Sequence, residues 1–539
     1  MIFPPHFREL AWRELDAPLD LLVIGGGITG AGVLHEAALR GLRVGLVEQG
    51  DFASGTSSRS SKLIHGGLRY LKRMQLRITR LACRERDLLL GANPQLVWPV
   101  RFLYPSFADD STPGWQVNLG LTMYDHLAPG RHHHERLETG AVAGLVPALA
   151  TEGLEFGLLY DDAAADDARL VLAVVAAGVA AGGSALNHAR VEGLLFDRAG
   201  RVEGAAVRDL PTGTVHRVHA AVTVNATGVW CDAVRGLLGS VPARLRPSRG
   251  SHLLFPRELL PLDVAVTALA GDDGRPVFCV PHPEGTLVGT TDLFHEGGLD
   301  APRPSADEVA YLLRFVARVF PGRRLGIADV CGAFAGVRPI LDSHADEPSE
   351  ASREEEIWEE RGLVSAAGGK LTTYRATAEE VVEAVIGLLP EQRREAFPPA
   401  HPASAALPWR AVPARVAAAL RHEGVVPDVA AGMARRLGAS ALLVASTAER
   451  KALRPLADGL DLCAAELLFH LRFGAVEHLD DLLLRRVRLG MWQPRVCLEL
   501  APRLRSVLRR PAGWGFVRWQ AELERVGNAV ANWLPPEAA

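Results

Sequence analysis

The sequence contains little of several features that identify particular classes of protein. Lysine is the first: only four of the 59 lysine and arginine residues are lysines, at positions 62, 72, 370 and 451. An arginine-rich, lysine-poor chain is typical of biased genome composition, and the net charge of −4 gives no reason to expect nucleic-acid binding. Lys62 and Lys370 nevertheless fall inside two distinctive segments, SKLIHGG and GGKLTTYR, where an ammonium differs from a guanidinium in donor geometry and pKa range.

Disulfide and metal-binding patterns are also missing. The six cysteines are scattered and include no CxxC pair, which argues for a reducing compartment and against a disulfide framework or a zinc site. Three histidines stand side by side at 132–134, but adjacent residues of a strand or helix do not converge on one ion. We therefore expect no metal.

Long hydrophobic runs are absent as well. The nearest candidate, residues 170–181, is too short to cross a bilayer and fits a packed helix. The first fifteen residues lack the hydrophobic core of a signal peptide. The sequence thus predicts a protein that is neither exported by that route nor membrane-spanning, and it leaves peripheral attachment to a membrane open.

A glycine-rich segment near the N-terminus carries a strong structural signal. The apolar run 21–24 predicts a buried parallel strand, and an Ala-rich helix continues from the turn through about Arg40. A second strand at 44–47 ends at Glu48, and the turn between strand and helix holds three glycines in GxGxxG spacing: Gly25, Gly27 and Gly30. Glycine permits a tight turn, close approach of the backbone to a pyrophosphate and close helix–strand packing, while Glu48 is placed to bind a ribose. The complete unit predicts a dinucleotide site; a βαβ turn without a phosphate is the alternative.

The segments that follow suggest how the rest of the chain is organised. Residues 51–61 are rich in glycine, serine and threonine, which suits either a loop along an extended cofactor or a flexible linker. The sequence HGGLRYL follows at once, and its mixture of His, Gly, Arg and Tyr is not typical of a linker. Residues 395–413 are rich in proline and alanine and predict a second linker, and the chain beyond them has helical periodicity.

The order of these segments resembles that of the FAD-dependent, quinone-linked glycerol-3-phosphate dehydrogenases of the aerobic respiratory type. The resemblance extends over nearly the whole chain and rests on IGGGITGAG, GTSSRSSKLIHGGLRYL, MYDHL, YDDAAADDARLVL, NATGVW, RGSHLLFP, VGTTD, GVRP, GGKLTTYR and RRVRLGMW. The segments SSKLIHGGLRYL and GGKLTTYR are highly specific, whereas NATG and GTTD alone would suggest only a flavin oxidoreductase.

The resemblance implies an α/β fold similar to that of D-amino-acid oxidase. A Rossmann-like FAD-binding domain would be interleaved with an antiparallel-sheet substrate domain, and an all-α C-terminal cap domain would follow. We expect a leader at 1–18, a discontinuous FAD-binding domain at 19–80, 151–248 and 362–395, a substrate-binding domain at 81–150 and 249–361, a linker at 396–413 and the cap domain at 414–539.

The resemblance also assigns residues to the cofactor, FAD. The pyrophosphate would lie on Gly25, Gly27 and Gly30, and the ribose on Glu48. The residues implied along the flavin are Thr56, Ser57, Ser61, Lys62, Leu63, Gly66 and Gly67, and those implied to close the site are Gly228, Gly369, Lys370, Leu371 and Thr372.

For the substrate, the family pattern points to Arg69, Tyr70, His252, Arg338, Arg353 and Lys370. Arg338 and Arg353 are the preferred clamp for a phosphate monoester, because guanidinium groups bind it bidentately. His252 is the side chain best suited by pKa to remove the hydroxyl proton, and Lys370 would stabilise negative charge on the reduced flavin. The alternatives are a structural histidine at 252 and a solvated charge run around Arg353.

The reaction implied is oxidation of sn-glycerol 3-phosphate to dihydroxyacetone phosphate by hydride transfer from C2 to FAD, with electrons passed to a membrane quinone. Two alternatives stay open: a glycerol-3-phosphate oxidase that uses O2, and a flavin-dependent amine or amino-acid oxidoreductase. A quinone acceptor implies a cytoplasmic protein bound peripherally to the inner face of the membrane, and one hypothesis places Arg485, Arg486 and Arg488 at the bilayer surface. Packing of RRVRLGMW inside the cap domain is the rival interpretation, and the oligomeric state stays open, a homodimer included.

Overall fold

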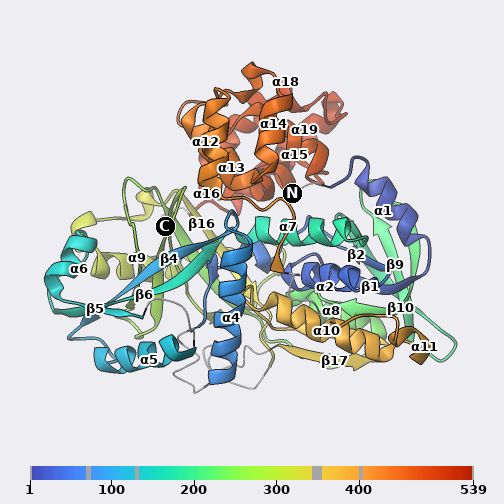
Figure 1. Cartoon of the computed structure of the whole chain (residues 1–539), viewed down its shortest axis with the longest axis horizontal. Coiled ribbons are helices and arrows are strands. Elements are labelled where there is room, and N and C mark those ends of the chain that lie inside the picture. The colour runs from blue at the N-terminus through green and yellow to red at the C-terminus, as the bar shows by residue number, and fades with distance from the viewer. Residues whose placement is uncertain (1–2, 68–74, 128–132, 343–354, 400–404, 537–539) are drawn as a thin grey trace.

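The computed structural model describes residues 3–67, 75–127, 133–342, 355–399 and 405–536. Two sheets lie side by side, and the helices of the C-terminal part of the chain lie above both (Figure 1). Within the described residues, none of the helices combines the length and the hydropathy that crossing a membrane requires.

The first sheet is organised around the strand that precedes the glycine-rich turn. Its eight strands are β1 (Leu19–Ile24), β2 (Val44–Val47), β7 (Ser184–Leu186), β8 (Ala189–Phe196), β9 (Val202–Asp209), β10 (Val215–Asn225), β17 (Glu356–Glu360) and β18 (Leu363–Ala367). The main order is β17–β18–β10–β1–β2–β7, with parallel pairing from β18 to β7 and an antiparallel extension through β9 and β8. The predicted strands at 21–24 and 44–47 are confirmed.

Both faces of this sheet are covered, which explains the uninterrupted apolar run in β1. Helices α2 (Ile28–Leu39), α7 (Asp167–Ala180) and α10 (Tyr374–Leu388) pack on the face that carries Val23. The opposite face, with Leu22 and Ile24, packs against α1 (Phe7–Leu15) and the β8–β9 pair. Buried parallel strands have this two-sided apolar character because neither face meets water.

The second sheet is mostly antiparallel. Its ten strands are β3 (Leu63–Ile64), β4 (Val97–Phe107), β5 (Glu135–Leu137), β6 (Leu154–Ala165), β11 (Ser248–Phe255), β12 (Ala265–Leu269), β13 (Pro276–His282), β14 (Gly285–Gly289), β15 (Leu293–Phe294) and β16 (Gly332–Arg338). The main order is β15–β11–β14–β13–β12–β4–β6–β3, with β16 on β11 and β5 on β6. Because β3 pairs with β6, the segment 48–67, which includes β3, passes from the first sheet to the second. This segment is the crossing loop.

Strand pairing places two segments differently from the predicted domain boundaries. β6 begins the segment 151–248, which the sequence assigns to the FAD-binding domain, but it pairs with β4 in the second sheet. β17 ends the segment 249–361, which the sequence assigns to the substrate domain, but it pairs with β18 in the first sheet. Sequence periodicity identifies a strand without identifying the strand it pairs with. The sheets to which β6 and β17 belong were therefore not predictable.

Further helices surround the second sheet and the junction: α4 (Leu76–Ala92), α5 (Gly114–Leu127), α6 (Thr139–Leu145) and α9 (Ala306–Val319). Two short helices, α8 (Cys231–Arg235) and α11 (Glu391–Arg394), lie beside the first sheet (Figure 1). A capping box starts α9, where Ser305 and Glu308 satisfy each other's backbone N–H groups. The helix is amphipathic, and its apolar face packs on the core of the second sheet.

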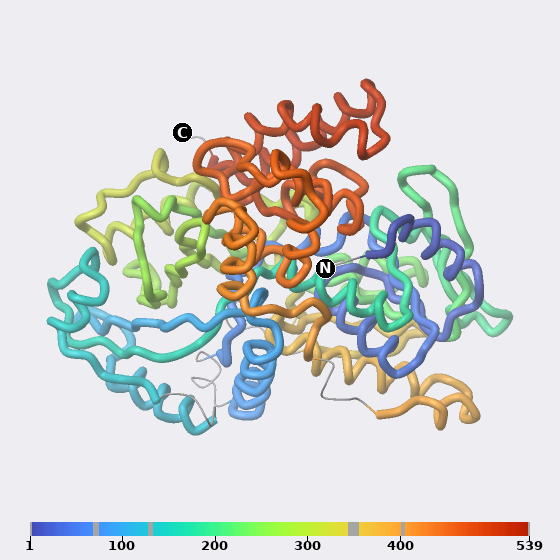
Figure 2. The backbone as a smooth tube through the Cα atoms, turned by 45° about the horizontal axis from the view of Figure 1, so that its top comes forward, coloured from blue at the N-terminus to red at the C-terminus, as the bar shows by residue number. Residues whose placement is uncertain are grey.

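The C-terminal part is helical, as predicted. It comprises α12 (Pro413–His422), α13 (Pro427–Leu437), α14 (Ser440–Thr447), α15 (Ala464–Phe473), a π-helical turn η8 (Asp481–Arg486), α16 (Leu489–Trp492), α17 (Pro494–Leu500), α18 (Arg505–Leu508) and α19 (Phe516–Ala531). Residues near both chain ends join it to the rest: Phe3 N donates to Phe473 O at 2.9 Å, and Ala333 N donates to Trp533 O at 2.8 Å. Figure 2 shows the C-terminal helices lying across both sheets.

Candidate active site

The glycine-rich turn forms a cradle at the carboxyl edge of the first sheet. Gly25 has φ +112°, and a Cβ there would lie 2.6 Å from Ala226 O. A Cβ on Gly30 would overlap the Gly25 carbonyl oxygen, so helix α2 can approach the turn only because residue 30 lacks a side chain. The N-terminal N–H groups of α2 face this edge, and Ile28 N donates to Ser57 Oγ at 3.0 Å.

Glu48 completes the cradle at the end of β2. Its carboxylate accepts hydrogen bonds from Gly26 N at 2.6 Å and Gly50 N at 2.7 Å. Burial raises the pKa of Glu48, and the two backbone N–H groups oppose that rise. A buried acid fixed beside the turn, together with a backbone that leaves no room for side chains, fits the phosphates and ribose of a dinucleotide.

A cavity of about 1260 Å³ lies beside this cradle, between the two sheets. Its wall includes the crossing loop, α5, the inner face of the second sheet and the turn after β18. Nine predicted site residues line it: Thr56, Ser61, Leu63, Gly67, Arg338, Gly369, Lys370, Leu371 and Thr372. The volume and the mixed polar and apolar lining suit a flavin ring with a small substrate.

Four other predicted cofactor residues do not line the cavity. Ser57 stands at the start of α2, and Gly228 opens the turn η2 (Gly228–Trp230) after β10. Gly66 N donates to Tyr124 Oη at 2.9 Å. Lys62 is buried and its ammonium contacts Asp167 Oδ2 at 2.8 Å. The predicted substrate residues Arg69, Tyr70 and Arg353 lie outside the described part of the chain.

Lys62 is oriented toward the C-terminal helices. Besides Asp167 it contacts Ser58 O at 3.2 Å, and Arg488 Nη2 binds the other Asp167 oxygen at 3.1 Å. Burial and the positive charge of Arg488 lower the pKa of Lys62 to about 8, against the attraction of Asp167. Lys62, the lysine of SKLIHGG, therefore holds the crossing loop through Ser58 and Asp167 and does not line the cavity.

Arg338 is held at the cavity wall by carboxylate and hydroxyl partners. Its Nη1 lies 2.8 Å from Asp292 Oδ1, and its Nη2 donates to Thr290 Oγ1 at 3.0 Å. Asp292 also binds Arg275 Nη2 at 2.8 Å, and Arg275 lines the same cavity. Two guanidinium groups thus share one buried carboxylate, which holds both of them at the cavity wall. Arg275 lies outside the motifs that carry the family resemblance, so its place at the cavity was not predictable.

His252 lies behind the cavity wall. Its side chain is buried, with 1% of the residue exposed, and its Nε2 is 2.9 Å from Ser61 Oγ. Burial, together with the positive charges of Arg338 and Lys62, holds the pKa of His252 well below its ordinary value. The imidazole is therefore neutral at pH 7.

A buried polar network near the crossing loop was missed by sequence reasoning. Tyr124 Oη donates to Asp162 Oδ2 at 3.0 Å and accepts from Arg86 Nη1 at 2.9 Å and from Gly66 N. Tyr124 belongs to MYDHL and Asp162 to YDDAAADDARLVL, so these motifs contained the signal, although no role had been assigned to either residue. The network positions the glycine pair that ends the loop.

The hypothesis that Arg485, Arg486 and Arg488 lie at the bilayer surface is wrong. All three are buried between the C-terminal helices and the cofactor domain. Arg485 and Arg486 bind Asp51, and Arg488 binds Asp167. Buried carboxylates require such partners. Asp51 and Asp167 each precede the arginine that binds them by more than 300 residues, and a single sequence does not show such a pairing.

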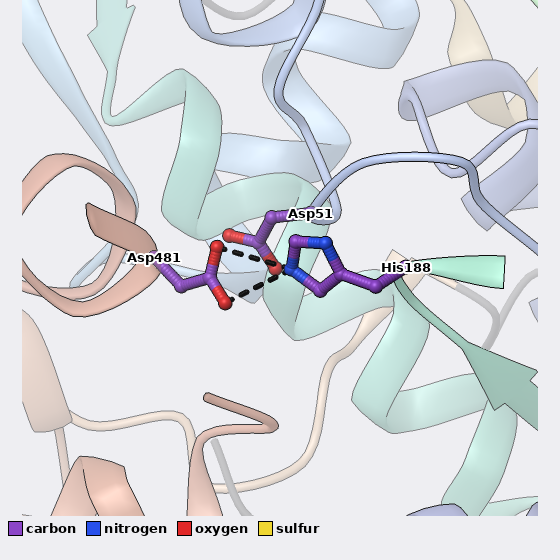
Figure 3. Close-up of side chains that lie close together, drawn as sticks. All are labelled: Asp51, His188 and Asp481. Carbon is purple, nitrogen blue, oxygen red and sulfur yellow. Dashed lines mark hydrogen bonds and ion pairs between the residues drawn. The ribbon is translucent and has the colours of Figure 1, made fainter. Parts of the chain in front are cut away.

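The same interface contains a compact acid–histidine cluster. Asp51, His188 and Asp481 offer ligand atoms within 4.8 Å of one another, and His188 Nε2 lies 3.0 Å from Asp481 Oδ2 (Figure 3). Arg485 and Arg486 already neutralise both carboxylates. The cluster is therefore an ion-pair network between domains, and we assign no metal to it.

Comparison with known proteins adds independent evidence. Residues 20–384 match the family described as FAD dependent oxidoreductase, and residues 404–518 match the C-terminal domain of alpha-glycerophosphate oxidase. The aerobic glycerol-3-phosphate dehydrogenase of Bacillus subtilis (strain 168) is 37% identical over 384 residues, 70% of this chain and 69% of that protein. The protein of the same name from Staphylococcus haemolyticus (strain JCSC1435) is 36% identical over 395 residues, 72% and 71% of the two chains.

Solved structures agree with these matches. The glycerol-3-phosphate dehydrogenase of Bacillus halodurans complexed with FAD has a TM-score of 0.81 at 28% identity, covering 99% of this chain and 98% of that chain. The L-α-glycerophosphate oxidase of Mycoplasma pneumoniae with FAD bound has a TM-score of 0.56 at 19% identity, covering 68% and 95%. The second likeness shows the fold alone.

Proposed function

Because this chain belongs to the family of FAD-dependent glycerol-3-phosphate dehydrogenases, we propose that it oxidises sn-glycerol 3-phosphate to dihydroxyacetone phosphate and passes the electrons to a membrane quinone. The observation that carries the substrate is the placement of Arg338, fixed by Asp292, in one cavity with Lys370. A phosphate monoester has nearly two negative charges, and an oriented guanidinium binds it through paired hydrogen bonds.

The cofactor is FAD, and when bound it accepts the hydride that leaves C2 of the substrate. Gly25, Gly30 and Glu48 form the part of the cradle that would hold its pyrophosphate and ribose. Arg338 binds the substrate phosphate, and Lys370 supplies positive charge at the same cavity. His252 is the base on which the charge of the proton released from the C2 hydroxyl ends. The sequence also assigns Arg69, Tyr70 and Arg353 to the substrate; these three lie outside the described residues.

The substrate is tested by anaerobic bleaching of the yellow enzyme. Glycerol 3-phosphate should bleach the flavin, whereas glycerol and free polyols should do so far more slowly because they lack the phosphate. Bleaching by amino acids without bleaching by glycerol 3-phosphate would instead identify an amine or amino-acid oxidoreductase, the activity class of several chains with a similar fold.

The electron acceptor is tested separately, since an oxidase would share the same substrate site. The enzyme is reduced with glycerol 3-phosphate and mixed in a stopped-flow instrument with either oxygen or a soluble ubiquinone analogue. Fast reoxidation by the quinone and slow reoxidation by oxygen are expected; the opposite order would make the protein a glycerol-3-phosphate oxidase.

A quinone acceptor requires contact with a bilayer, and we place that contact at helices α4 and α5. Trp115 and Leu119 on α5 are 65% and 55% exposed, and Arg77, Arg80 and Arg84 are exposed on α4. The two helices contact each other through Arg86 and Tyr124 and lie on the side away from the C-terminal helices (Figure 1). Exposed apolar side chains beside basic ones suit an anionic phospholipid surface. Leu119 also lines the active-site cavity.

A further inference from the structure

Ser61 stands between the cavity and the His252 imidazole. The serine lines the cavity, whereas His252 is buried and does not line it. The Ser61 Oγ–His252 Nε2 distance of 2.9 Å is that of a hydrogen bond. A substrate hydroxyl in the cavity would therefore meet the serine before it met the histidine.

The imidazole is fixed in this position by its surroundings. Its ring stacks on Phe334 with centroids 4.7 Å apart and an interplanar angle of 14°. The opposite contact is Gly289, where any Cβ would overlap the ring. His252 cannot swing into the cavity without displacing these neighbours, and among the described residues its Nδ1 has no hydrogen-bond partner. Among the described residues, the hydrogen bond of the imidazole is made with Ser61.

We propose that Ser61 is a catalytic proton relay, beyond the cofactor contact that the sequence predicted for it. The C2 hydroxyl of glycerol 3-phosphate gives its proton to Ser61 Oγ while the Ser61 proton passes to His252 Nε2. The electron pair of the broken O–H bond forms the carbonyl, and C2–H leaves with its pair as hydride to the flavin. This inference rests on the proposed function.

The charges around His252 suit this role. Lys62 faces it from the crossing loop and Arg338 from the end of β16, while Phe334 and Gly289 are uncharged. Both positive charges, together with burial, keep the resting imidazole neutral and ready to accept a proton. A substrate phosphate on Arg338 would offset one of them, so the protonated imidazole becomes less unfavourable when substrate is bound.

Two isosteric variants isolate the hydroxyl. Ser61→Thr keeps it and Ser61→Val replaces it with a methyl group of similar size. Flavin reduction by glycerol 3-phosphate is measured anaerobically in a stopped-flow instrument from pH 5.5 to 9, in H2O and D2O. Because a positioned general base contributes about 10²–10⁴-fold, Val should be slower than Thr by about 10²-fold or more, with an altered pH profile. Equal rates in Thr and Val would overturn the relay.

The double variant Ser61→Val/His252→Gln tests whether the two residues act together. In a relay, removing the imidazole costs little once the hydroxyl is gone. Independent, additive losses would contradict the proposal. If the added bulk of Thr or Val prevents flavin binding, Ser61→Ala against wild type, each with and without His252→Gln, makes the same comparison.

A readout independent of turnover comes from ¹⁵N NMR of labelled histidine, with the His252 signals assigned by difference from His252→Gln. The relay requires unprotonated Nε2 and protonated Nδ1 in the resting wild-type enzyme and in Ser61→Thr. A wild-type Nε2–H tautomer would exclude it, because that nitrogen then cannot accept the serine proton. Wild-type enzyme that glycerol 3-phosphate does not bleach would instead refute the proposed function itself.

Discussion

The carboxylate of Asp51 is bound by Arg486, with Oδ1 and Nη2 2.9 Å apart and both side chains buried. Asp51 lies three residues after Glu48, at the cofactor cradle, whereas Arg486 belongs to the C-terminal helices. Arg486 also donates to Gly474 O at 2.6 Å and Ala475 O at 2.8 Å. One side chain thus joins the cofactor loop to the backbone of the cap domain, so the stability of each depends on the other.

Replacing Arg486 should therefore destabilise the whole protein. Arg486→Met leaves a buried Asp51 with one fewer partner, removes the side-chain donor to Gly474 O and leaves Ala475 O with Asn187 alone, and breaking such a pair costs about 3–5 kcal/mol. Chemical denaturation followed by tryptophan fluorescence measures the loss, and flavin fluorescence should report cofactor release at lower denaturant concentration.

The matched control is Arg190→Met. Arg190 also pairs with an acid, Glu192 at 3.1 Å, but half of its side chain is exposed. Exposed pairs contribute about 0–1 kcal/mol, so this variant should unfold like the wild type. Equal losses in both variants would show that the interface does not depend on the buried pair.

The neighbouring His188–Asp481 pair should make stability depend on pH. Burial lowers the pKa of His188, but the Asp481 carboxylate outweighs it and the net shift is upward. A raised histidine pKa contributes stability fully below the unfolded pKa of about 6.5, and that contribution is lost as pH rises through the folded pKa. The free energy of unfolding of wild type minus His188→Asn should therefore be largest between about pH 5 and 6 and fall by pH 9.

Asparagine is the suitable replacement because residue 188 has φ +50°, a left-handed conformation that asparagine tolerates. The Asp481 pKa is shifted in the other direction, well below its ordinary value, against burial and because of His188 and the nearby arginines. Its contribution is lost only as the pH falls below about 4. A difference that grows with pH above 7 would contradict the assigned ion pair.

These interdomain contacts also show where the sequence stops being informative. That Gly25, Gly30 and Glu48 meet at one turn was predictable because they follow each other within one βαβ unit, and the motifs pointed to Arg338 and Lys370, which line one cavity; the roles of these residues stay predictions. The helical cap was predictable from periodicity. The partners of Arg486 and Arg488 were not, because ion pairs across hundreds of residues leave no spacing pattern in one sequence. Nor does a motif show that the Lys62 side chain points away from the cavity and toward Asp167.

The glycine pattern makes a prediction with a control in another helix. A methyl group at Gly30 would overlap the Gly25 carbonyl oxygen, so Gly30→Ala should separate α2 from the turn. The expected cost is about 1–3 kcal/mol, with loss of FAD from the purified protein. Gly527→Ala in α19, where nothing lies within 4 Å of the added methyl group, should instead be neutral or stabilise by about 0.5–1 kcal/mol. The absorbance ratio at 450 and 280 nm and thermal unfolding measure both.

Arg338→Met should reduce selectivity for the phosphate. Loss of hydrogen bonds to a charged group costs about 1.5–3 kcal/mol, so kcat/KM for glycerol 3-phosphate should fall by about 10–100-fold or more. The much slower reaction with glycerol should change little, since glycerol has no phosphate. A merely structural Arg338 would lower both together. Arg257→Met, which removes an exposed pair with Asp263, should leave both at wild-type values.

The membrane surface is tested by exchanging one exposed aromatic residue on each side of the molecule. Trp115→Ser on α5 should reduce binding to anionic phospholipid vesicles by about 10-fold, since burying a large apolar side chain contributes about 1.5–3 kcal/mol. Binding should also weaken with salt, because Arg77, Arg80 and Arg84 are exposed. Phe516→Ser on α19, 57% exposed in the wild type, is the matched control and should bind as the wild type does. Vesicle sedimentation measures both variants. Loss of binding in Phe516→Ser alone would place the docking surface on the cap domain, and Leu119, which is exposed and lines the cavity, would then lie on the side away from the membrane.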